Sequence, residues 1–360
     1  MATVTTIKFS SGFLPTQPVV GSRSCFFKTS SILKRSFVAK VRASSTAFVE
    51  TKPSEPIVVE NEVNTNKTIL ACPICYEPVM WIGDSYLSVG SIPSSSLQCN
   101  NCKKTYSGKE THFDLTAASG AKGYGESMPL ATEIFRTPLV SFLYERGWRQ
   151  NFIWGGFPGP EKEFELMKDY LKPVLGGNII DASCGSGMFS RLFAKSGLFS
   201  LVVALDYSEN MLQQCFEFIK KEENFPEENY VLVRADISRL PFASSSVDAL
   251  HAGAAIHCWP SPSTAVAEIS RVLRPGGVFV ASTYILDGPF NFIPFVRHFS
   301  PDNGGYWFLL QNIMQISGSY AFLAERELED LCKACGLVGF TCIRKWTFCD
   351  VYCCQTQISI

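Results

Sequence analysis

Long apolar runs are absent from this chain of 360 residues. No run approaches the ~18 residues that a membrane-spanning helix requires, so we expect no transmembrane helix. Acidic residues are absent from residues 1–49, and the first one in the chain is Glu50. That segment holds seven basic residues and many serines and threonines, but it has no continuous apolar stretch. This composition excludes a secretory signal peptide and is typical of an organelle transit peptide.

The same segment favours the chloroplast as its destination. Residues 1–3 carry no charged side chain, and residues 41–43 offer a cleavage site. We therefore predict a chloroplast transit peptide over residues 1–43 and a flexible linker over residues 44–68, whose polar sequence contains two prolines. The alternative interpretation of residues 1–43 is a disordered basic tail.

Positive charge is also scarce in the remainder of the chain. The full sequence has 32 basic and 33 acidic residues. Loss of the seven basic residues in 1–43 leaves 25 basic against 33 acidic ones, a net charge of −8. Because phosphate contacts need lysine and arginine, this balance opposes non-specific binding to nucleic acid.

Cysteine, in contrast, is abundant, and the spacing of four cysteines points to a metal. Among the 14 cysteines, Cys72/Cys75 and Cys99/Cys102 form two Cys-x-x-Cys pairs with 23 residues between them. Two such pairs provide four thiolates for a tetrahedral Zn²⁺ site with metal–sulfur distances of ~2.3 Å. Such a site is closed, so its zinc is structural, and we predict a zinc-ribbon-like module over residues 69–115. The alternatives are two redox dithiols or buried free thiols.

From residue 176 onward, the order of strand and turn patterns is typical of a doubly wound α/β sheet. Residues 178–182 are typical of a buried strand, and the Gly-x-Gly turn of Gly185 and Gly187 follows. The next apolar run, residues 201–205, ends in Asp206. A strand, a tight glycine turn and an acid at the tip of the next strand form the arrangement that holds an adenosine-type ligand.

Further features follow in the order that such a sheet requires. Residues 231–235 are typical of a third strand, and Asp236 follows them. Residues 247–250 and 278–281 are typical of a fourth and a fifth strand. Ser190 stands where a dinucleotide-binding fingerprint has a third glycine. The glycine pair alone therefore does not identify the ligand.

The ordered set of motifs resembles the class I S-adenosylmethionine (SAM) dependent methyltransferases. Asp181, Gly185 and Gly187 match the first motif of that family. Residues 206–212 match the second motif, and residues 271–277 match the turn before strand five. Ser183 departs from the pattern, because the family usually has glycine at this position.

The resemblance covers roughly residues 120–350, and it implies an α/β fold. We expect a Rossmann-like, seven-stranded methyltransferase sheet over residues 176–360, with residues 337–346 and 347–358 as strands six and seven and the last one antiparallel. A helical lid segment over residues 116–175 would precede it. The zinc-ribbon-like module and the disordered transit peptide come before the lid.

The resemblance also implies how SAM is held. The glycine turn would lie under the methionine and ribose portions of the ligand. The residues assigned are Asp181 for the ammonium group, Gly185 and Gly187 for the turn, Asp206 for the ribose hydroxyls, Tyr207 for stacking against the adenosine, and Asp236 and Ile237 for the adenine.

His257 is the one candidate for a catalytic residue. It follows the predicted fourth strand, where the methyl group should point, and an imidazole with its ordinary pKa of ~6.5 is a feasible general base. The alternative, which we favour, is that His257 caps the loop or packs against Trp259.

Two regions rich in aromatic residues, 124–165 and 290–308, flank the predicted cofactor motifs. They indicate an apolar acceptor or a surface that touches lipid, or else ordinary core packing. The arrangement resembles plant plastid methyltransferases related to the quinone C-methyltransferases, some of which associate with plastoglobules. We therefore expect SAM-dependent methylation of a small, hydrophobic, quinone- or lipid-like acceptor in the chloroplast stroma or in peripheral contact with plastoglobule or thylakoid lipid.

Two other functions remain open. A zinc ribbon ahead of a methyltransferase domain also resembles the bacterial large-subunit rRNA guanine methyltransferases, although the net charge argues against a nucleic-acid partner. The second alternative is a SAM-binding protein without turnover, because no obligatory catalytic base is visible.

Overall fold

The computed structural model describes part of the chain: residues 69–82, 88–92, 95–119, 133–148, 150, 153, 157–285, 321–345 and 348–356. All of them belong to one compact unit, Thr65–Ile360. The predicted transit peptide and linker, and the aromatic residues between 286 and 320, lie outside the described residues. Within the described part, no helix is long and apolar enough to cross a bilayer.

A single large sheet organises this unit, with the strand order β10-β11-β9-β8-β5-β6-β7-β4. Its strands are β4 (Phe113–Asp114), β5 (Asn178–Ala182), β6 (Leu201–Asp206), β7 (Tyr230–Arg234), β8 (Val247–Gly253), β9 (Leu273–Thr283), β10 (Leu337–Lys345) and β11 (Phe348–Thr356). The strands from β4 to β9 pair in parallel, whereas β11 runs antiparallel to both β9 and β10. The predicted Rossmann-like methyltransferase sheet with an antiparallel last strand is confirmed, and β4 adds an eighth strand that the sequence had not indicated.

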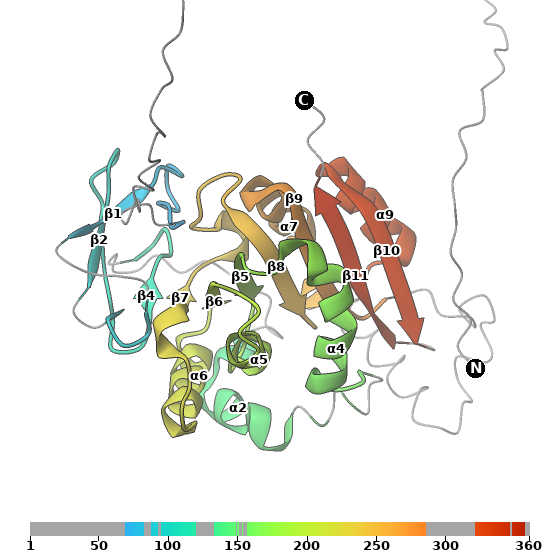
Figure 1. Ribbon diagram of the computed structural model, residues 1–360, viewed down its shortest axis with the longest axis horizontal. Helices are drawn as coiled ribbons and strands as arrows, with labels where there is room; N and C mark the ends of the chain where they lie inside the picture. The colour runs from blue at the N-terminus through green and yellow to red at the C-terminus, as the bar shows by residue number, and fades with distance from the viewer. Residues whose placement is uncertain are drawn as a thin grey trace, which may run out of the picture. The chain divides into compact units, whose positions relative to one another are not determined.

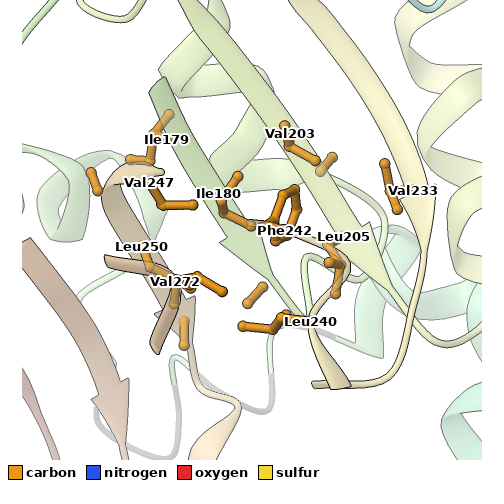
Figure 2. Close-up of a cluster of buried hydrophobic side chains, with 14 of the residues drawn as sticks. Ile179, Ile180, Val203, Leu205, Val233, Leu240, Phe242, Val247, Leu250 and Val272 are labelled. Carbon is orange, nitrogen blue, oxygen red and sulfur yellow. The ribbon is translucent and has the colours of Figure 1, made fainter. Parts of the chain in front are cut away.

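The central strands are buried on both faces, which explains their nearly continuous apolar sequences. Ile179 and Ile180 of β5 point to opposite faces of the sheet, and both are fully buried. Figure 2 shows how β5, β6, β7 and β8 contribute branched side chains to one core, together with loop residues and the last residue of the helix Pro262–Val272. Those labelled are Ile179, Ile180, Val203, Leu205, Val233, Leu240, Phe242, Val247, Leu250 and Val272.

Helices cover both faces of the sheet (Figure 1). On one face lie α4 (Pro160–Leu171), α5 (Met188–Lys195) and α6 (Glu209–Lys221), and on the other lie α7 (Pro262–Val272) and α9 (Glu325–Ala334). Serine side chains begin two of them: the Ser208 hydroxyl accepts the Met211 N–H in α6, and the Ser261 hydroxyl accepts the Thr264 N–H in α7. The short helical segments are η2 (Ile134–Arg136), α2 (Pro138–Leu143), η3 (Tyr144–Trp148), η4 (Lys172–Val174), η5 (Glu227–Asn229), η6 (Ile237–Arg239) and η7 (Ile256–Cys258).

The cysteine-rich module is joined to the large sheet. Its own small antiparallel sheet contains β1 (Val79–Ile82), β2 (Ser96–Cys99) and β3 (Thr105–Ser107), and the chain then enters β4. Backbone hydrogen bonds tie the start of the module to the loop after η6, from Ala71 N to Pro241 O at 2.8 Å and from Ala243 N to Ile69 O at 3.0 Å. The module therefore shares one hydrophobic core with the parallel strands.

Gly187 generates a prediction about folding, because it begins α5 at a φ of 81° and a Cβ there would lie 2.1 Å from Cys215 Sγ. Gly197, just past the other end of α5, has a φ of 64° and no atom within 4 Å of such a Cβ. Alanine at either position costs about 1–2 kcal/mol for the left-handed backbone, and Gly187→Ala adds about 1–3 kcal/mol of overpacking. Urea unfolding should show the larger loss for Gly187→Ala; equal losses would mean that Cys215 moves freely aside.

Candidate active site

A cavity opens at the carboxyl ends of the parallel strands, where α/β sheets bind ligands. The space inside it, about 910 Å³, includes open solvent at its mouth. Its walls come from the loops after β5, β6, β7 and β8 and from the short helices η2 and η3. The lining residues are Phe135, Arg136, Tyr144, Ser183, Gly185, Leu205, Asp206, Tyr207, Ser208, Met211, Ala235, Asp236, Ile237, Gly253, Ala254, Ala255, Cys258, Trp259 and Pro260.

Asp206 is held against the glycine turn at the centre of this cavity. Its Oδ2 accepts the Gly185 N–H at 2.8 Å, and its Oδ1 accepts the Ser208 N–H at 2.8 Å. Each carboxylate oxygen has a second lone pair, so both can also accept a hydroxyl proton. Burial raises the pKa of Asp206 to about 6, and the carboxylate is therefore mostly ionised at neutral pH.

The serine that replaces the family glycine is accommodated in the turn. Ser183 has a φ of 59°, in the left-handed region that non-glycine residues rarely adopt. Its hydroxyl accepts the indole N–H of Trp259 at 3.0 Å, and both residues line the cavity. The hydrogen bond therefore joins the turn after β5 to the loop after β8. No local pattern predicts this pairing, because 76 positions separate the two residues.

Asp236 and Ile237 lie together at the end of the cavity beside β7. Asp236 caps the short helix η6, because its Oδ1 accepts the Ser238 N–H at 2.8 Å and the Ser238 hydroxyl at 2.7 Å. The Ile237 side chain is buried, and it lines the cavity next to the carboxylate. An acid and an apolar side chain at one edge fit a base that has both a donor group and a flat face.

Three of the predicted site residues do not line the cavity. Gly187 begins α5 behind the turn. Asp181 is buried, and its Oδ1 lies 2.7 Å from His251 Nδ1. Its Oδ2 has no hydrogen-bond partner among the described residues, and neither does His251 Nε2. Asp181 therefore joins β5 to β8 within the core and does not face the cavity.

His257 is the third residue outside the lining. Its Nδ1 lies 3.0 Å from Thr283 Oγ1, and its ring stacks on Phe322 with an interplanar angle of 10°. Burial lowers the pKa of His257 to about 3, so the imidazole is neutral at physiological pH and only weakly basic. These contacts agree with a packing role, although its neighbours are Phe322 and Thr283 rather than Trp259.

The helical segment before β5 covers the glycine turn. Tyr144 lies above Gly185, since a Cβ on that glycine would be 3.3 Å from the tyrosine ring. The adjacent Glu145 accepts from the Ser186 hydroxyl and from Arg191 NH2, which lies 2.7 Å from both carboxylate oxygens. These contacts anchor η3 to the turn and to α5.

Arg136 lies beside Tyr207 in the lining of the same cavity. Its guanidinium lies 4.7 Å from the centre of the Tyr207 ring, in a cation–π contact. Phe135, Arg136 and Tyr144, which belong to the aromatic-rich region 124–165, all line the cavity.

The four predicted metal ligands also come together. The sulfur atoms of Cys72, Cys75, Cys99 and Cys102 all lie within 4.8 Å of one another. Sulfurs at the corners of a tetrahedron with metal–sulfur distances of ~2.3 Å are about 3.8 Å apart. The Cys72–Cys102 distance is 3.6 Å and the Cys75–Cys99 distance is 3.4 Å, far longer than a disulfide bond of ~2.05 Å. The donor set therefore fits a closed four-thiolate metal site.

Groups around the cluster stabilise its sulfurs. The Tyr106 hydroxyl lies 3.1 Å from Cys72 Sγ, and the Ile74 N–H donates to the same sulfur at 3.4 Å. Outer hydrogen bonds of this kind orient metal ligands.

Comparison with known proteins identifies the family to which the chain belongs. A family model described as a methyltransferase domain matches residues 180–281. An uncharacterized chloroplastic methyltransferase of Arabidopsis thaliana is 70% identical over 284 residues, which cover 78% of this chain and 77% of that protein. A second chloroplastic methyltransferase of Arabidopsis is 45% identical over 339 residues, 90% of this chain and 91% of that protein. A demethylmenaquinone methyltransferase of Staphylococcus aureus is 35% identical over 143 residues, 39% of this chain and 51% of that protein.

The raised pKa of Asp206 predicts how SAM binding depends on pH. Ribose hydroxyls bound at Asp206 would donate to its ionised carboxylate, so the Kd for SAM should rise up to tenfold per pH unit as the pH falls below about 6. The ammonium group of the ligand, with a pKa of about 8, does not titrate in that range. Calorimetry between about pH 7 and pH 5 tests this, with Asp206→Asn as the control that should bind weakly and without this pH dependence. A flat profile for the unmodified chain would contradict the role of Asp206.

The burial of His257 predicts that its ring is needed for packing. His257→Ala should keep methyl transfer per folded molecule while the free energy of unfolding falls by about 2–4 kcal/mol. His257→Phe retains an aromatic ring against Phe322 without an ionisable nitrogen, and it should transfer methyl groups normally. Should both variants bind SAM but lose turnover, His257 is the general base after all.

Proposed function

The chain belongs to the family of its two chloroplastic Arabidopsis relatives and is a SAM-dependent methyltransferase; we propose that it methylates a small, hydrophobic, quinone-like acceptor in the chloroplast. The observation that carries the proposal is the cavity at the carboxyl ends of β5 to β8. It combines a carboxylate that faces a glycine turn with walls that are mostly apolar.

We assign the polar end of the cavity to the cofactor. Asp206 accepts the ribose hydroxyls, Tyr207 and Ile237 pack on the adenosine, and Asp236 accepts from the adenine amino group. The backbone of Gly185 lies along the ligand, and Asp181 and Gly187 support that turn from behind. SAM, when bound, supplies a methyl group on a positively charged sulfur.

The protein's part in the reaction is alignment and exclusion of water. The lid residue Tyr144 covers the turn, and the Ser183–Trp259 hydrogen bond holds the opposite wall in place. Holding two reactants in line can lower the activation free energy by ~7–11 kcal/mol. An acceptor that has already lost its proton when it reaches the cavity needs no general base from the protein.

The other walls of the cavity favour an apolar acceptor. Ala254, Ala255, Cys258, Trp259 and Pro260 line one side, and Phe135 and Tyr144 face the same space. The local likeness to a demethylmenaquinone methyltransferase supports an acceptor of the quinone type. The chloroplastic names of the two long relatives and the composition of residues 1–43 support the chloroplast as the location. Because a quinone-type acceptor dissolves in lipid, we place the protein in the stroma or at the plastoglobule surface.

We also propose that the four-cysteine cluster holds structural Zn²⁺. Four thiolates in a tetrahedral arrangement bind zinc or an iron–sulfur cluster. A closed site in which four thiolates surround one ion is typical of structural zinc. The metal would cross-link two turns of a module too small to form a core of its own.

The acceptor is tested with the full chain and SAM that carries a labelled methyl group. The chain is incubated with chloroplast lipid extract and, separately, with chloroplast rRNA. Label should appear in the lipid incubation, in an organic-soluble product that is heavier than its precursor by one CH₂ group. Asp206→Asn should abolish the labelling. Label in rRNA instead would support a ribbon-guided RNA enzyme, and SAM binding without label in any fraction would indicate a protein without turnover.

A further inference from the structure

The segment η6 and the residues after it connect the cofactor cavity to the cysteine module. Arg239, the last residue of η6, follows the cavity residue Ile237 by two positions. Its Nε donates to the Pro73 carbonyl at 2.8 Å, and its NH2 donates to the Ile74 carbonyl at 3.1 Å. These two carbonyls lie between Cys72 and Cys75, inside the first turn of the metal site.

Tyr76 extends this contact on the far side of the cysteine turn. The guanidinium of Arg271 lies 4.2 Å from the centre of its ring, and that of Arg239 lies at 5.6 Å. Arg271 also donates to the Leu240 carbonyl at 2.8 Å, and Glu268 accepts the Leu240 N–H at 2.8 Å. The segment that leaves η6 is therefore held between the cysteine turn and α7.

A second connection runs through β4, the strand that follows the cysteine module. Arg234 of β7 donates to Asp114 of β4 at 3.1 Å and to the backbone carbonyl of Tyr207 at 3.0 Å. Tyr207 directly follows Asp206 and lines the cavity. The module is thus bonded to both residue pairs that we assign to the adenosine. Arg239 connects it to Asp236 and Ile237, and Arg234 connects it to Asp206 and Tyr207.

We infer that Arg239 is a positioning residue through which metal occupancy of the four-cysteine site sets the affinity of the cavity for SAM. The inference rests on the proposed function, in which SAM fills the cavity and the four thiolates hold zinc. With the metal bound, the carbonyls of Pro73 and Ile74 are fixed acceptors for Arg239, and η6 presents Asp236 and Ile237 to the adenine in a fixed position.

Loss of the metal removes the cross-link between the two cysteine turns. Cys72 and Cys99 are buried in the core, but Ile74 is 43% exposed and Cys102 is exposed too, so the outer part of each turn loses its restraint once the metal is gone. Arg239 then loses fixed partners, and SAM must order η6 when it binds, which weakens the affinity. Because coupling between two ligands is reciprocal, SAM must tighten the binding of zinc by the same factor.

The experiment uses the full chain loaded with Zn²⁺, its zinc content measured by mass spectrometry, and the same chain after chelation under reducing conditions. Calorimetry should give a Kd for SAM that is roughly five- to tenfold higher without zinc. In the reciprocal measurement, SAM should slow the transfer of zinc to a coloured chelator, and its effect on the zinc Kd should match that factor. This second readout needs no acceptor and no turnover.

Two variants and a control isolate the residue. Arg239→Ala should keep one zinc per chain and bind SAM about as weakly as the metal-free native chain, with little further change on chelation. Arg239→Lys retains one donor and should restore part of the coupling. Arg274→Ala is the matched control, because Arg274 pairs with Asp248 at the start of β8, at the opposite end of the strands, and it should leave the coupling unchanged.

The outcomes separate the coupling from the function on which it rests. An equal Kd for SAM with and without zinc, in a chain that circular dichroism shows to be folded, overturns the coupling alone. Full coupling in Arg239→Ala overturns the role of Arg239 in that coupling. If the metal-free chain unfolds, the zinc-loaded Arg239→Ala variant still decides, since native SAM affinity there overturns the inference. A zinc-loaded chain that binds no SAM overturns the proposed function and the coupling together.

Discussion

The hydrogen bond from the Gly185 N–H to the Asp206 carboxylate is the constraint on which the cavity depends. It can form only because β5 and β6 are neighbours in parallel register, with Ala182 opposite Leu205, so that both strands end at one edge. The same carboxylate accepts the Ser208 N–H at the start of α6. One buried acid thereby fixes the glycine turn, the strand tip and a helix start relative to one another, and it still has lone pairs for a ligand.

Around this centre, buried and half-buried polar side chains hold the loops in place. Ser183 and Trp259 join two loops across the cavity, and Glu145 joins the lid to Ser186 and Arg191. Behind the turn, the Tyr230 hydroxyl donates to Ser190 at 2.8 Å. A buried hydroxyl with a partner costs little, whereas an unpaired one is expensive, which accounts for serine at this position in place of the third glycine of a dinucleotide site.

The cysteine module changes how the domain should be described. The predicted boundary at residue 115 separates it from the methyltransferase sheet, yet β4 pairs with β7 and the module's apolar residues join the same core. Arg234 and Arg239 make contacts that no independent domain would need. The loops at the end of the cavity beside β7 are therefore bonded to the module through Arg234 and Arg239.

The sequence by itself determined the elements whose evidence is local. The strands from β5 to β8, the glycine turn, the acids at the strand tips and the two cysteine pairs all follow from periodicity, turn chemistry and ligand spacing within short windows. The turn expected at residues 274–277 is present as a bulge in β9, where the register passes from Leu273 to Val278. Asp206, Asp236 and Ile237 reach the cavity for the same reason, because each follows the end of a recognisable strand.

Only the tertiary structure decided the long-range pairings. Asp181 bonds to His251 and His257 stacks on Phe322, although the sequence offered both as candidates to meet the ligand or its acceptor. The addition of β4 to the sheet and the contact of Arg239 with the cysteine turn join residues more than a hundred positions apart. Contacts of this kind depend on which surfaces meet when the elements pack, and a single sequence carries no periodic pattern that specifies them.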